Sequence, residues 1–380
     1  MRNVLKWFGG AAVVLVLTAL SIRPAAAIVV GPGNCNESGL SSALAAVDTP
    51  SGGTITFNCG TATINFTSGK QIANTVTIDG GGTITFDGGN AHGFFQFFFS
   101  SHVTLKGLTF QHGILSNGVR ALENIGALRL DHVKVINNNS TRGPVLNSGT
   151  LDVVWSTFSG NSATSGTDGD GGAIENNGGS LSVLASTFNG NTAAHQGGAI
   201  FSNSDFSITN STFNNNTGTG GGGAIYQEQG GNSILSFSTV VGNHSPVFGA
   251  GVYNDGGGSS QGTLTIFSSI VSGNETGNCD GLLQTGGYNL SNGTGCGGVF
   301  TGTGDLINQN LVMGALTNNG GPTQTMLPAA GNPAINHVPS GVCQLQYDQR
   351  GGGRPTGAAC DSGAVEVGAT IDLIFADGFE

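Results

Sequence analysis

The sequence predicts an all-β fold, a parallel β-helix in which short strands wind in stacked coils around an apolar core. Three observations predict it. Glycine makes up 68 of the 380 residues and charged residues only 9%, yet 37% are hydrophobic and regularly placed, as in a folded repeat. A pattern of apolar and polar positions recurs every 23 to 31 residues, which is typical of solenoids. No repeat carries a helical period of useful length, which disfavours leucine-rich and all-helical solenoids.

Each repeat closes on an asparagine and carries apolar residues three, eight and ten positions earlier, except that Ser233 stands ten positions before Asn243. The closing residues are Asn138, Asn161, Asn191, Asn216, Asn243 and Asn274, and the phenylalanines three positions earlier are Phe158, Phe188 and Phe213. Positions eight and ten residues before the asparagine share one face of a strand, whereas the third apolar position follows at an odd offset. A bend must therefore separate two strands in each coil. We expect like residues to stack about 4.8 Å apart, phenylalanine on phenylalanine inside and asparagine on asparagine at the bends.

A further strand begins at the tetrapeptide GGAI. It occurs at 171–174, 197–200 and 222–225, with a weaker form at 249–252. The glycines let the backbone bend so that an apolar side chain such as Ile200 can enter the core. The preceding loop 192–196, which contains His195, is then the part of its repeat that is free to contact a partner.

The first 27 residues have the pattern of a secretory signal peptide. Arg2 and Lys6 precede an apolar run to about Ile22, and small residues end at Ala27, where we expect cleavage. The run is shorter than the about 18 to 20 residues that span a bilayer, and no later segment approaches that length. Cleavage would leave eight basic and 22 acidic residues, a net charge of −14, so nucleic acid is an unsuitable partner.

The remaining chain divides into four predicted segments. Residues 28–53 form an N-terminal cap, whose stretch 36–47 places Leu40, Leu44 and Val47 on one face of a short helix. Residues 54–300 form the parallel β-helix, and 301–368 add C-terminal coils. Residues 369–380 form an acidic and hydrophobic tail, interpreted as a sorting signal or as a frayed end.

Six cysteines fall into three sequence-local pairs. They are Cys35 with Cys59, Cys279 with Cys296, and Cys343 with Cys360. Export makes disulfides the first interpretation, and no CxxC spacing indicates zinc or redox chemistry. The local pairing is one of 15 connectivities that six cysteines allow.

The FxxN and GGAI elements over about 130–280 resemble the repeats of polymorphic outer-membrane proteins. The stretch DQRGGGRPTGAACDSGAVE at 348–366 is similar to the choice-of-anchor module that ends secreted bacterial β-helix proteins. Its matching positions here are Asp348, Arg350, Gly351, Arg354, Cys360, Asp361, Gly363, Ala364 and Glu366. The tail 371–380 looks like tails of secreted Gram-negative proteins. These resemblances imply a right-handed, pectin-lyase-like β-helix, exported to the outer-membrane surface or the medium of a Gram-negative bacterium and attached through its C-terminus.

The same fold class also contains pectate lyases and polygalacturonases, so an enzyme must be considered. No Lys or Arg lies between Gly143 and Gln349, which removes much of the chain as a groove for acidic sugars. One basic cluster precedes that gap. Its catalytic candidates are Arg120, Arg129, His132 and Arg142, and the binding candidates are Glu123, Asp131, Lys134 and His195. The alternative interpretation is a set of surface ion pairs, with Lys106 one coil below Asp131.

Other candidate chemistry is sparse. Glycoside hydrolysis needs two carboxylates across a cleft, for which Glu175 and Glu228 are candidates. Asp168 and Asp170 alternate with glycine, so their loop is either a calcium site or an ordinary polar turn. The seven histidines show no HExxH or HxH spacing, and we expect no other metal and no cofactor. We interpret Asp348, Arg350, Arg354, Asp361 and Glu366 as an ion network that closes the C-terminal coils.

The sequence therefore predicts an exported surface scaffold that binds polysaccharide or cell-surface glycan without catalysis. One alternative is a polysaccharide lyase or glycoside hydrolase of the pectin-lyase-like class. Another is a self-associating structural surface protein.

Overall fold

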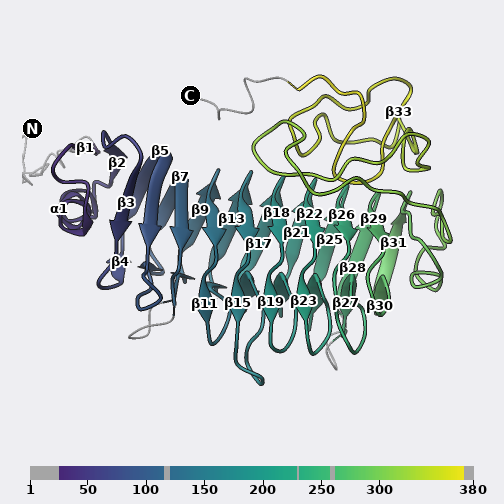
Figure 1. Cartoon of the computed structure of the whole chain (residues 1–380), viewed down its shortest axis with the longest axis horizontal. Coiled ribbons are helices and arrows are strands. Elements are labelled where there is room, and N and C mark those ends of the chain that lie inside the picture. The colour runs from purple at the N-terminus through teal and green to yellow at the C-terminus, as the bar shows by residue number, and fades with distance from the viewer. Residues whose placement is uncertain (1–24, 115–119, 229–230, 257–261, 372–380) are drawn as a thin grey trace, which may run out of the picture.

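The chain forms a rod of stacked coils, as the repeats predict (Figure 1). The computed structural model describes residues 25–114, 120–228, 231–256 and 262–371. The predicted signal peptide lies outside them up to residue 24, and the predicted tail lies outside them from residue 372. Strands of successive coils pair in parallel and form three long columns, here called faces 1, 2 and 3. The prediction of an all-β parallel β-helix is confirmed.

Face 1 contains the first strand of each coil. In stacking order it comprises β1 (Ala26–Val30), β2 (Gly53–Phe57), β5 (Thr75–Asp87), β7 (His102–Gln111), β9 (Ala127–Asp131), β13 (Thr150–Val154), β17 (Ser180–Leu184), β21 (Phe206–Thr209), β25 (Asn232–Ser236), β28 (Thr263–Phe267) and β31 (Leu283–Gly287). The strands β5 and β7 are long enough to continue around a bend into face 2.

Face 2 follows that bend. Besides the ends of β5 and β7 it comprises β3 (Ala62–Asn65), β10 (Lys134–Ile136), β14 (Thr157–Ser159), β18 (Thr187–Asn189), β22 (Thr212–Asn214), β26 (Thr239–Val241) and β29 (Ile270–Ser272). A short column after it comprises β11 (Asn139–Ser140), β15 (Ser162–Ala163), β19 (Thr192–Ala193) and β23 (Thr217–Gly218).

Face 3 holds the strands that begin at GGAI in the repeats. It comprises β4 (Lys70–Ile72), β6 (Phe95–Phe97), β8 (Leu122–Asn124), β12 (Val145–Asn147), β16 (Ile174–Asn176), β20 (Ile200–Ser202), β24 (Ile225–Gln227), β27 (Val252–Asn254) and β30 (Cys279–Gly281). The apolar side chains of the three faces form one continuous core along the rod.

Like residues stack in register inside this core. Phe158 pairs with Phe188, and Phe188 pairs with Phe213, in adjacent coils. Their ring centroids are 4.7 and 4.8 Å apart, with the ring planes within 4° of parallel. The spacing equals the distance between paired strands, so the stack follows directly from the coil register.

The closing asparagines form a buried hydrogen-bond ladder. The Oδ1 atom of Asn161 accepts from the backbone nitrogen and the Nδ2 of Asn138, at 3.1 and 2.9 Å. The same pattern repeats through Asn191, Asn216, Asn243 and Asn274. These bends leave backbone groups without strand partners, and a buried unpaired group is costly. The asparagine side chains satisfy them and fix the register.

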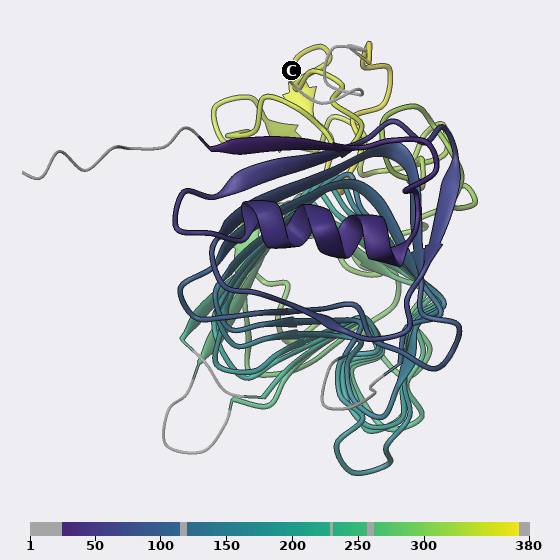
Figure 2. The ribbon, with the colours of Figure 1, turned by 90° about the vertical axis from the view of Figure 1, so that its left-hand side faces the viewer.

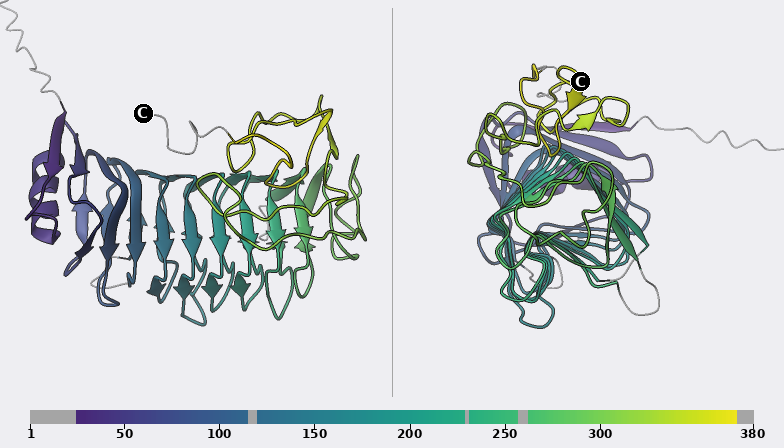
Figure 3. Two further views of the ribbon diagram at one scale, coloured as in Figure 1. Left: turned by 45° about the horizontal axis from the view of Figure 1, so that its top comes forward. Right: turned by 90° about the vertical axis from the view of Figure 1, so that its right-hand side faces the viewer.

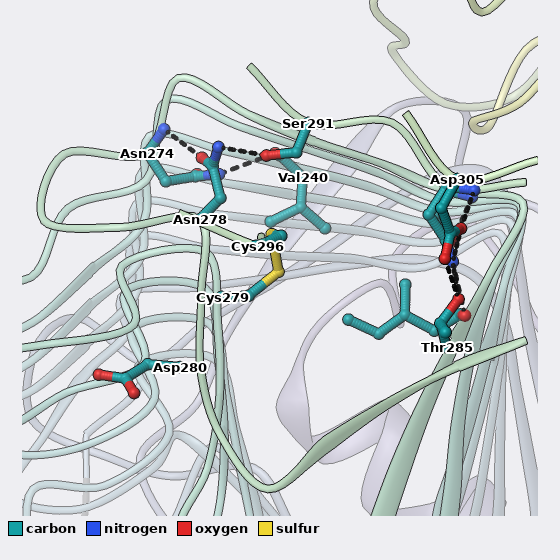
Figure 4. Close-up of a disulfide and its surroundings, with 12 residues drawn as sticks. Val240, Asn274, Asn278, Cys279, Asp280, Thr285, Ser291, Cys296 and Asp305 are labelled. Atoms are coloured by element: carbon teal, nitrogen blue, oxygen red, sulfur yellow. Dashed lines mark hydrogen bonds between the residues drawn. A yellow bond between two sulfur atoms is a disulfide. The ribbon is translucent and has the colours of Figure 1, made fainter. Parts of the chain in front are cut away.

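Figure 4 shows where this ladder ends, beside the disulfide Cys279–Cys296. The Nδ2 of Asn274 donates to the Oδ1 of Asn278, and the Nδ2 of Asn278 donates to the Oγ of Ser291 at 2.8 Å. The ladder therefore finishes on partners within the last coil instead of on exposed amides.

Each coil turns from face 1 to face 2 at a residue with positive φ. These residues, here called the bend column, are His132, Trp155, Ala185, Asn210, Phe237 and Ser268, with φ between 44° and 54°. Such values are uncommon for residues other than glycine. Their recurrence at the same place in six coils makes the bend a regular feature of this repeat.

A helix covers the N-terminal end of the core (Figure 2). It is α1 (Glu37–Val47), and the side chain of Asn36 caps it by accepting from the backbone nitrogen of Gly39 at 3.0 Å. Leu40, Leu44 and Val47 are buried, together with Ala43. The predicted capping helix is confirmed, and it protects the open end of the apolar core.

The coils expected over 301–368 continue only through its first residues. After β31, Leu290 bridges in parallel to Ile270 and to Leu306, and backbone hydrogen bonds join residues 288–293 to 303–308. Residues 309–371, here called the C-terminal segment, fold back along the outside of the rod (Figure 3). Their only strand pair is antiparallel, between β32 (Val338–Pro339) and β33 (Ala359–Cys360). The FxxN and GGAI columns end before this segment, so it has no repeat with which to form another coil.

The C-terminal segment docks on the bend column. The Oγ1 of Thr323 donates to the carbonyl of Ala185 at 3.1 Å, and the Nδ2 of Asn210 donates to the carbonyl of Tyr347 at 2.7 Å. The backbone nitrogen of Gly363 donates to the carbonyl of Ser268 at 2.8 Å. The segment thus crosses several coils and is fixed to each.

A buried charge network holds the C-terminal segment in shape. Asp348 accepts from the Nε and Nη2 of Arg350 at 3.0 and 2.8 Å, and Arg354 pairs with Glu366 at 3.2 Å. Asp361 accepts from two backbone nitrogens, and all five side chains are buried. Because isolated buried charges are costly, the pairs and backbone donors are needed for this packing.

Three disulfides join the sequence-local pairs. They are Cys35–Cys59, Cys279–Cys296 and Cys343–Cys360, and no cysteine is free. The first lies beside the N-terminal cap, the second in the last coils and the third in the C-terminal segment. Among the described residues, no helix has the length and hydropathy of a membrane span.

We predict that Asn191→Ala destabilises the rod by about 2 to 3 kcal/mol. The change removes four hydrogen bonds, two accepted from Asn161 and two donated to Asn216 and the carbonyl of Phe158. Denaturant unfolding measures it. The exposed Asn139, changed to Ala, is the control and should alter stability by less than about 0.5 kcal/mol. Equal losses for the two variants would contradict the importance of the ladder.

Candidate functional site

A groove lies on the outside of face 1, toward the C-terminal end of the rod. Its volume is about 610 Å³. Strands β21, β25, β28 and β31 form its floor, and the C-terminal segment forms part of one side. The lining residues are Ser207, Thr209, Asn232, Ser233, Ile234, Ser236, Phe237, Thr263, Thr265, Phe267, Gln284, Gly286, Gln344 and Leu345.

The floor is a regular array of hydroxyl and amide groups. It arises because outward positions of adjacent strands stand in register, as Ser207 does with Ile234, and Ile234 with Thr265. Neighbouring hydroxyls interact across coils: the Oγ atoms of Thr209 and Ser236 are 3.0 Å apart. Sequence analysis expected exposed Ser, Thr and Asn on the rod but did not locate this groove.

Apolar side chains border the polar floor. Phe267 is half-buried at the groove, and Ile234 is 46% exposed in its floor. Phe237 and Leu345 belong to a small cluster with Val338 and Cys360 that attaches the C-terminal segment to the rod. The disulfide Cys343–Cys360 fixes the same part of the segment.

None of the lining residues is an acid, a base, a tyrosine or a cysteine. General acid–base catalysis needs a titratable side chain within hydrogen-bond reach of the reacting group. The groove can therefore bind hydroxyl-bearing and apolar surfaces, but its own side chains offer no proton transfer.

The basic cluster expected from the sequence is divided between two faces. On face 1, Lys106 pairs with Asp79 at 3.9 Å, although it stands beside Asp131 in register. Arg129 instead contacts Asp131, at 3.2 Å, and also pairs with Asp152. Lys106 and Arg129 thus each have a carboxylate partner. The net charge of these two cations and their acidic partners on face 1 is not positive.

His132 is held by Asp131, and one of its ring nitrogens is buried. Its Nδ1 lies 2.6 Å from the Oδ1 of Asp131, and its Nε2 is buried beside the ring of Trp155 without a hydrogen-bond partner. Burial alone would raise the pKa of Asp131, but the hydrogen bond with His132 and the charge of Arg129 hold that pKa below its ordinary value. Asp131 therefore stays ionised and interacts with both His132 and Arg129.

Arg120 and Arg142 lie instead at face 3, around one buried carboxylate. Arg120 donates to the carbonyl of Gly143 and to the Oε2 of Glu175, at 3.0 and 3.1 Å, and Arg142 pairs with the Oε1. Glu175 is 0% exposed, so neither it nor Arg120 can reach a substrate in this arrangement. Glu123 shares an outward row with Glu175, and Lys134 is exposed on face 2. The four catalytic candidates therefore do not form one site.

An outward row on face 3 was missed by sequence reasoning. It runs in register through Glu123, Leu146, Glu175, Phe201, Tyr226, Tyr253 and Asp280. The centroids of Phe201 and Tyr226 are 5.8 Å apart, and those of Tyr226 and Tyr253 4.9 Å. The residue after each GGAI was the available signal for this row.

The GGAI turns cover this row. Gly222 has φ 59°, and a Cβ on it would lie 2.6 Å from the Cβ of Tyr226. A Cβ on Gly223 would lie 2.4 Å from the carbonyl of Ala250 in the next coil. Glycine is required because the turn folds tightly over the outward side chain, and Tyr226 is left only 3% exposed. The rings of Phe201 and Tyr226 are therefore packed inside the rod's edge.

The remaining acidic candidates lie near this row. Asp170 lies 2.7 Å from the Nδ1 of His195 and accepts from the backbone nitrogen of Gln196 at 3.1 Å. Burial raises the pKa of Glu228, and the nearby charges of Asp170 and Asp255 add to the effect. Glu175 is enclosed by arginines, so the structure does not present Glu175 and Glu228 as two open carboxylates.

Asp168 lies on the same loop as Asp170 and is exposed. Within the described residues, no group of three or more His, Cys, Asp or Glu side chains is placed to hold a metal ion. Asp170 instead contacts His195 and the backbone nitrogen of Gln196. In this geometry Asp170 orders the loop that contains His195.

We predict that Glu228→Gln stabilises the protein at neutral pH. A carboxyl whose pKa is raised in the folded state binds its proton more tightly there than in the unfolded chain. Its ionisation therefore costs stability as pH rises above the ordinary value of 4.5. The amide removes this cost, so the variant should unfold at a higher temperature at neutral pH and at the parent temperature below that value.

Thermal unfolding at several pH values measures this difference. Asp280→Asn, at an exposed position of the same face, is the charge-matched control and should show a smaller shift. A less stable Glu228→Gln at neutral pH would show that the carboxylate is favourably paired.

A comparison with known families agrees with the repeat architecture. A family model described as the Chlamydia polymorphic membrane protein repeat matches residues 185–203 and 210–228. A solved structure titled "Structure of PL6 family alginate lyase AlyGC" is similar at 11% identity and a TM-score of 0.33, over 80% of this chain and 56% of that one. The chain thus spans little more than half the length of that enzyme. A search of curated proteins found no match. The chain is a β-helix repeat protein with two repeats similar to those of Chlamydia polymorphic membrane proteins.

Proposed function

We propose that this protein is an exported surface scaffold that binds uncharged polysaccharide in the face 1 groove without chemically changing it. The observation that carries the proposal is the groove's lining. It combines hydroxyl, amide and apolar side chains and contains no titratable residue. Such a surface can recognise sugars but has no side chain for general acid–base catalysis.

The chemistry of the lining suits an uncharged sugar chain. The hydroxyls of Thr209, Ser236 and Thr265 can donate to and accept from sugar hydroxyls, and side-chain amides add further partners. The ring of Phe267 and the side chain of Ile234 offer apolar area for the C–H faces of the sugar rings. A few polar groups among apolar ones is the usual composition of a small-molecule site.

Charge supports an uncharged ligand over an acidic one. The chain has a net charge of −11, and no Lys or Arg lies between Gly143 and Gln349, the stretch that supplies most of the groove. Lys106 and Arg129, the nearest basic side chains on face 1, are already paired with carboxylates. An acidic polysaccharide would therefore be repelled, which also weakens the lyase alternative.

Export and attachment are part of the same proposal. The three disulfides suit an oxidising compartment, and the pattern of residues 1–27 is the support for a signal peptide. The module-like residues 348–366 and the tail 369–380 support attachment through the C-terminus. Display of many copies on a surface would convert weak single contacts into useful avidity, as adhesion requires.

We predict that the full chain binds uncharged glycans on a panel that includes acidic ones, and releases no sugar. Thr265→Arg should weaken binding about tenfold or more, because the longer side chain fills the groove. Ser182→Arg is the matched control: Ser182 stands in register with Ser207 on face 1, but does not line the groove. It should bind as the parent does.

Three outcomes would contradict the proposal. Release of unsaturated or reducing sugar would show an enzyme. Equal loss of binding in both arginine variants would show that charge on face 1, and not the groove, determines binding. Concentration-dependent assembly without any glycan binding would favour the self-associating alternative.

A further inference from the structure

We propose that an aromatic subsite extends the groove along the rod, so that the ligand is a polymer that passes through both cavities and not a terminal sugar. The inference rests on the proposed function and specifies the length and character of its ligand. The subsite is a cavity of about 260 Å³ lined by Trp155, Leu184, Ala185, Asn210, Leu345, Gln346, Tyr347, Asp348 and Gly351.

The two cavities are neighbours along the same surface row. The outward residues at the ends of four successive face 1 strands stand in register: Phe267 beside Ser236, Ser236 beside Thr209, and Thr209 beside Leu184. The first three residues line the groove, and Leu184 lines the subsite. Leu345 of the C-terminal segment lines both. One track therefore runs along the rod axis, and Leu345 lies where the two cavities meet.

The chemistry changes along this track. The groove offers mostly hydroxyls and amides, whereas the subsite offers the side chains of Trp155, Leu184 and Tyr347. Leu184 is 37% exposed and Tyr347 is 41% exposed, so apolar area remains open to solvent. Aromatic rings of this kind offer broad apolar faces for the C–H faces of sugars. The indole Nε1 of Trp155 is buried without a hydrogen-bond partner. A chain of uncharged sugars presents both hydroxyl edges and apolar faces, and so matches both halves.

The subsite is built from firmly held parts. Trp155 belongs to the bend column, and its ring lies 5.1 Å from that of His132. The carbonyl of Tyr347 accepts from Asn210 at 2.7 Å, and the next residue, Asp348, is fixed by Arg350. Little ordering is then needed on binding, which favours affinity.

Trp155 makes the subsite directly observable. The sequence has two tryptophans, Trp7 and Trp155. In the full chain carrying Trp7→Phe, the tryptophan emission reports Trp155 alone. The probes are cello-, manno- and galacto-oligosaccharides, each from disaccharide to hexasaccharide, with affinity measured in parallel by calorimetry.

We predict that the shortest sugars bind the groove without changing the emission. Longer members of the recognised series should change it and bind about tenfold more tightly, because they pass Leu345 and reach the subsite. Leu184→Arg and Tyr347→Ala should each remove this gain for long ligands and leave the affinity of the disaccharide unchanged. Phe99→Ala, which removes an 87% exposed ring elsewhere, should change neither.

The outcomes separate this inference from the proposed function. Binding that does not increase with length and leaves the emission unchanged would overturn the subsite while the groove stands. Loss of disaccharide affinity in both Leu184→Arg and Tyr347→Ala would also overturn it, since the two cavities would then be one site. Absence of binding by every series would overturn both proposals.

Discussion

The register between coils is the constraint on which the rest of the molecule depends. Parallel pairing places each residue above its counterpart in the previous coil, and the asparagine ladder prevents a slip because its amides bond only in one register. A slip of one residue would turn each inward side chain to the surface. The same register that stacks Phe158 on Phe188 inside also creates the outward rows. The hydroxyl floor of the groove is therefore a consequence of coil stacking, with no separate element needed to build it.

The C-terminal segment gives the regular rod a groove on face 1. It docks on the bend column, and its charge network keeps it compact. Arg354 is central there: it pairs with Glu366, donates to the carbonyls of Asp361 and Gly363, and lies 5.0 Å from the ring centre of Phe237. Burial raises the pKa of both Asp361 and Glu366, so these carboxylates depend on their donors. The residues of this charge network, between 348 and 366, thus also position Leu345 and Tyr347 beside face 1.

Much of the fold was predictable because it follows from residue spacing, either within one short segment or repeated from coil to coil. Phe188 and Asn191 could be assigned to columns from spacing alone, and the capping helix from the spacing of Leu40, Leu44 and Val47. The folding back of residues 309–371 was not predictable in this way, because it depends on contacts such as that of Asn210 with Tyr347, 137 positions apart. The groove was missed for the same reason, since two distant segments form it. The basic cluster shows the reverse case, in which residues close in sequence were expected to lie together. Arg120 and Arg129 are nine positions apart but lie on different faces.

Charge is arranged so that the ligand track is left neutral. Among the described residues, the cations near face 1, Lys106 and Arg129, are paired with carboxylates, and Lys134 is exposed on face 2. Arg350 and Arg354 of the C-terminal segment are buried, and Asp348, which lines the subsite, is paired with Arg350. The acidic side chains near Tyr226 lie at face 3. The central claim, that the neutral track on face 1 is the binding surface, is tested most directly by hydrogen–deuterium exchange of the full chain with and without a bound neutral oligosaccharide. Protection is expected in residues 206–209, 232–236, 263–267 and 344–348. Protection confined to the loops and strands of face 3, around residues 170–228, would contradict it.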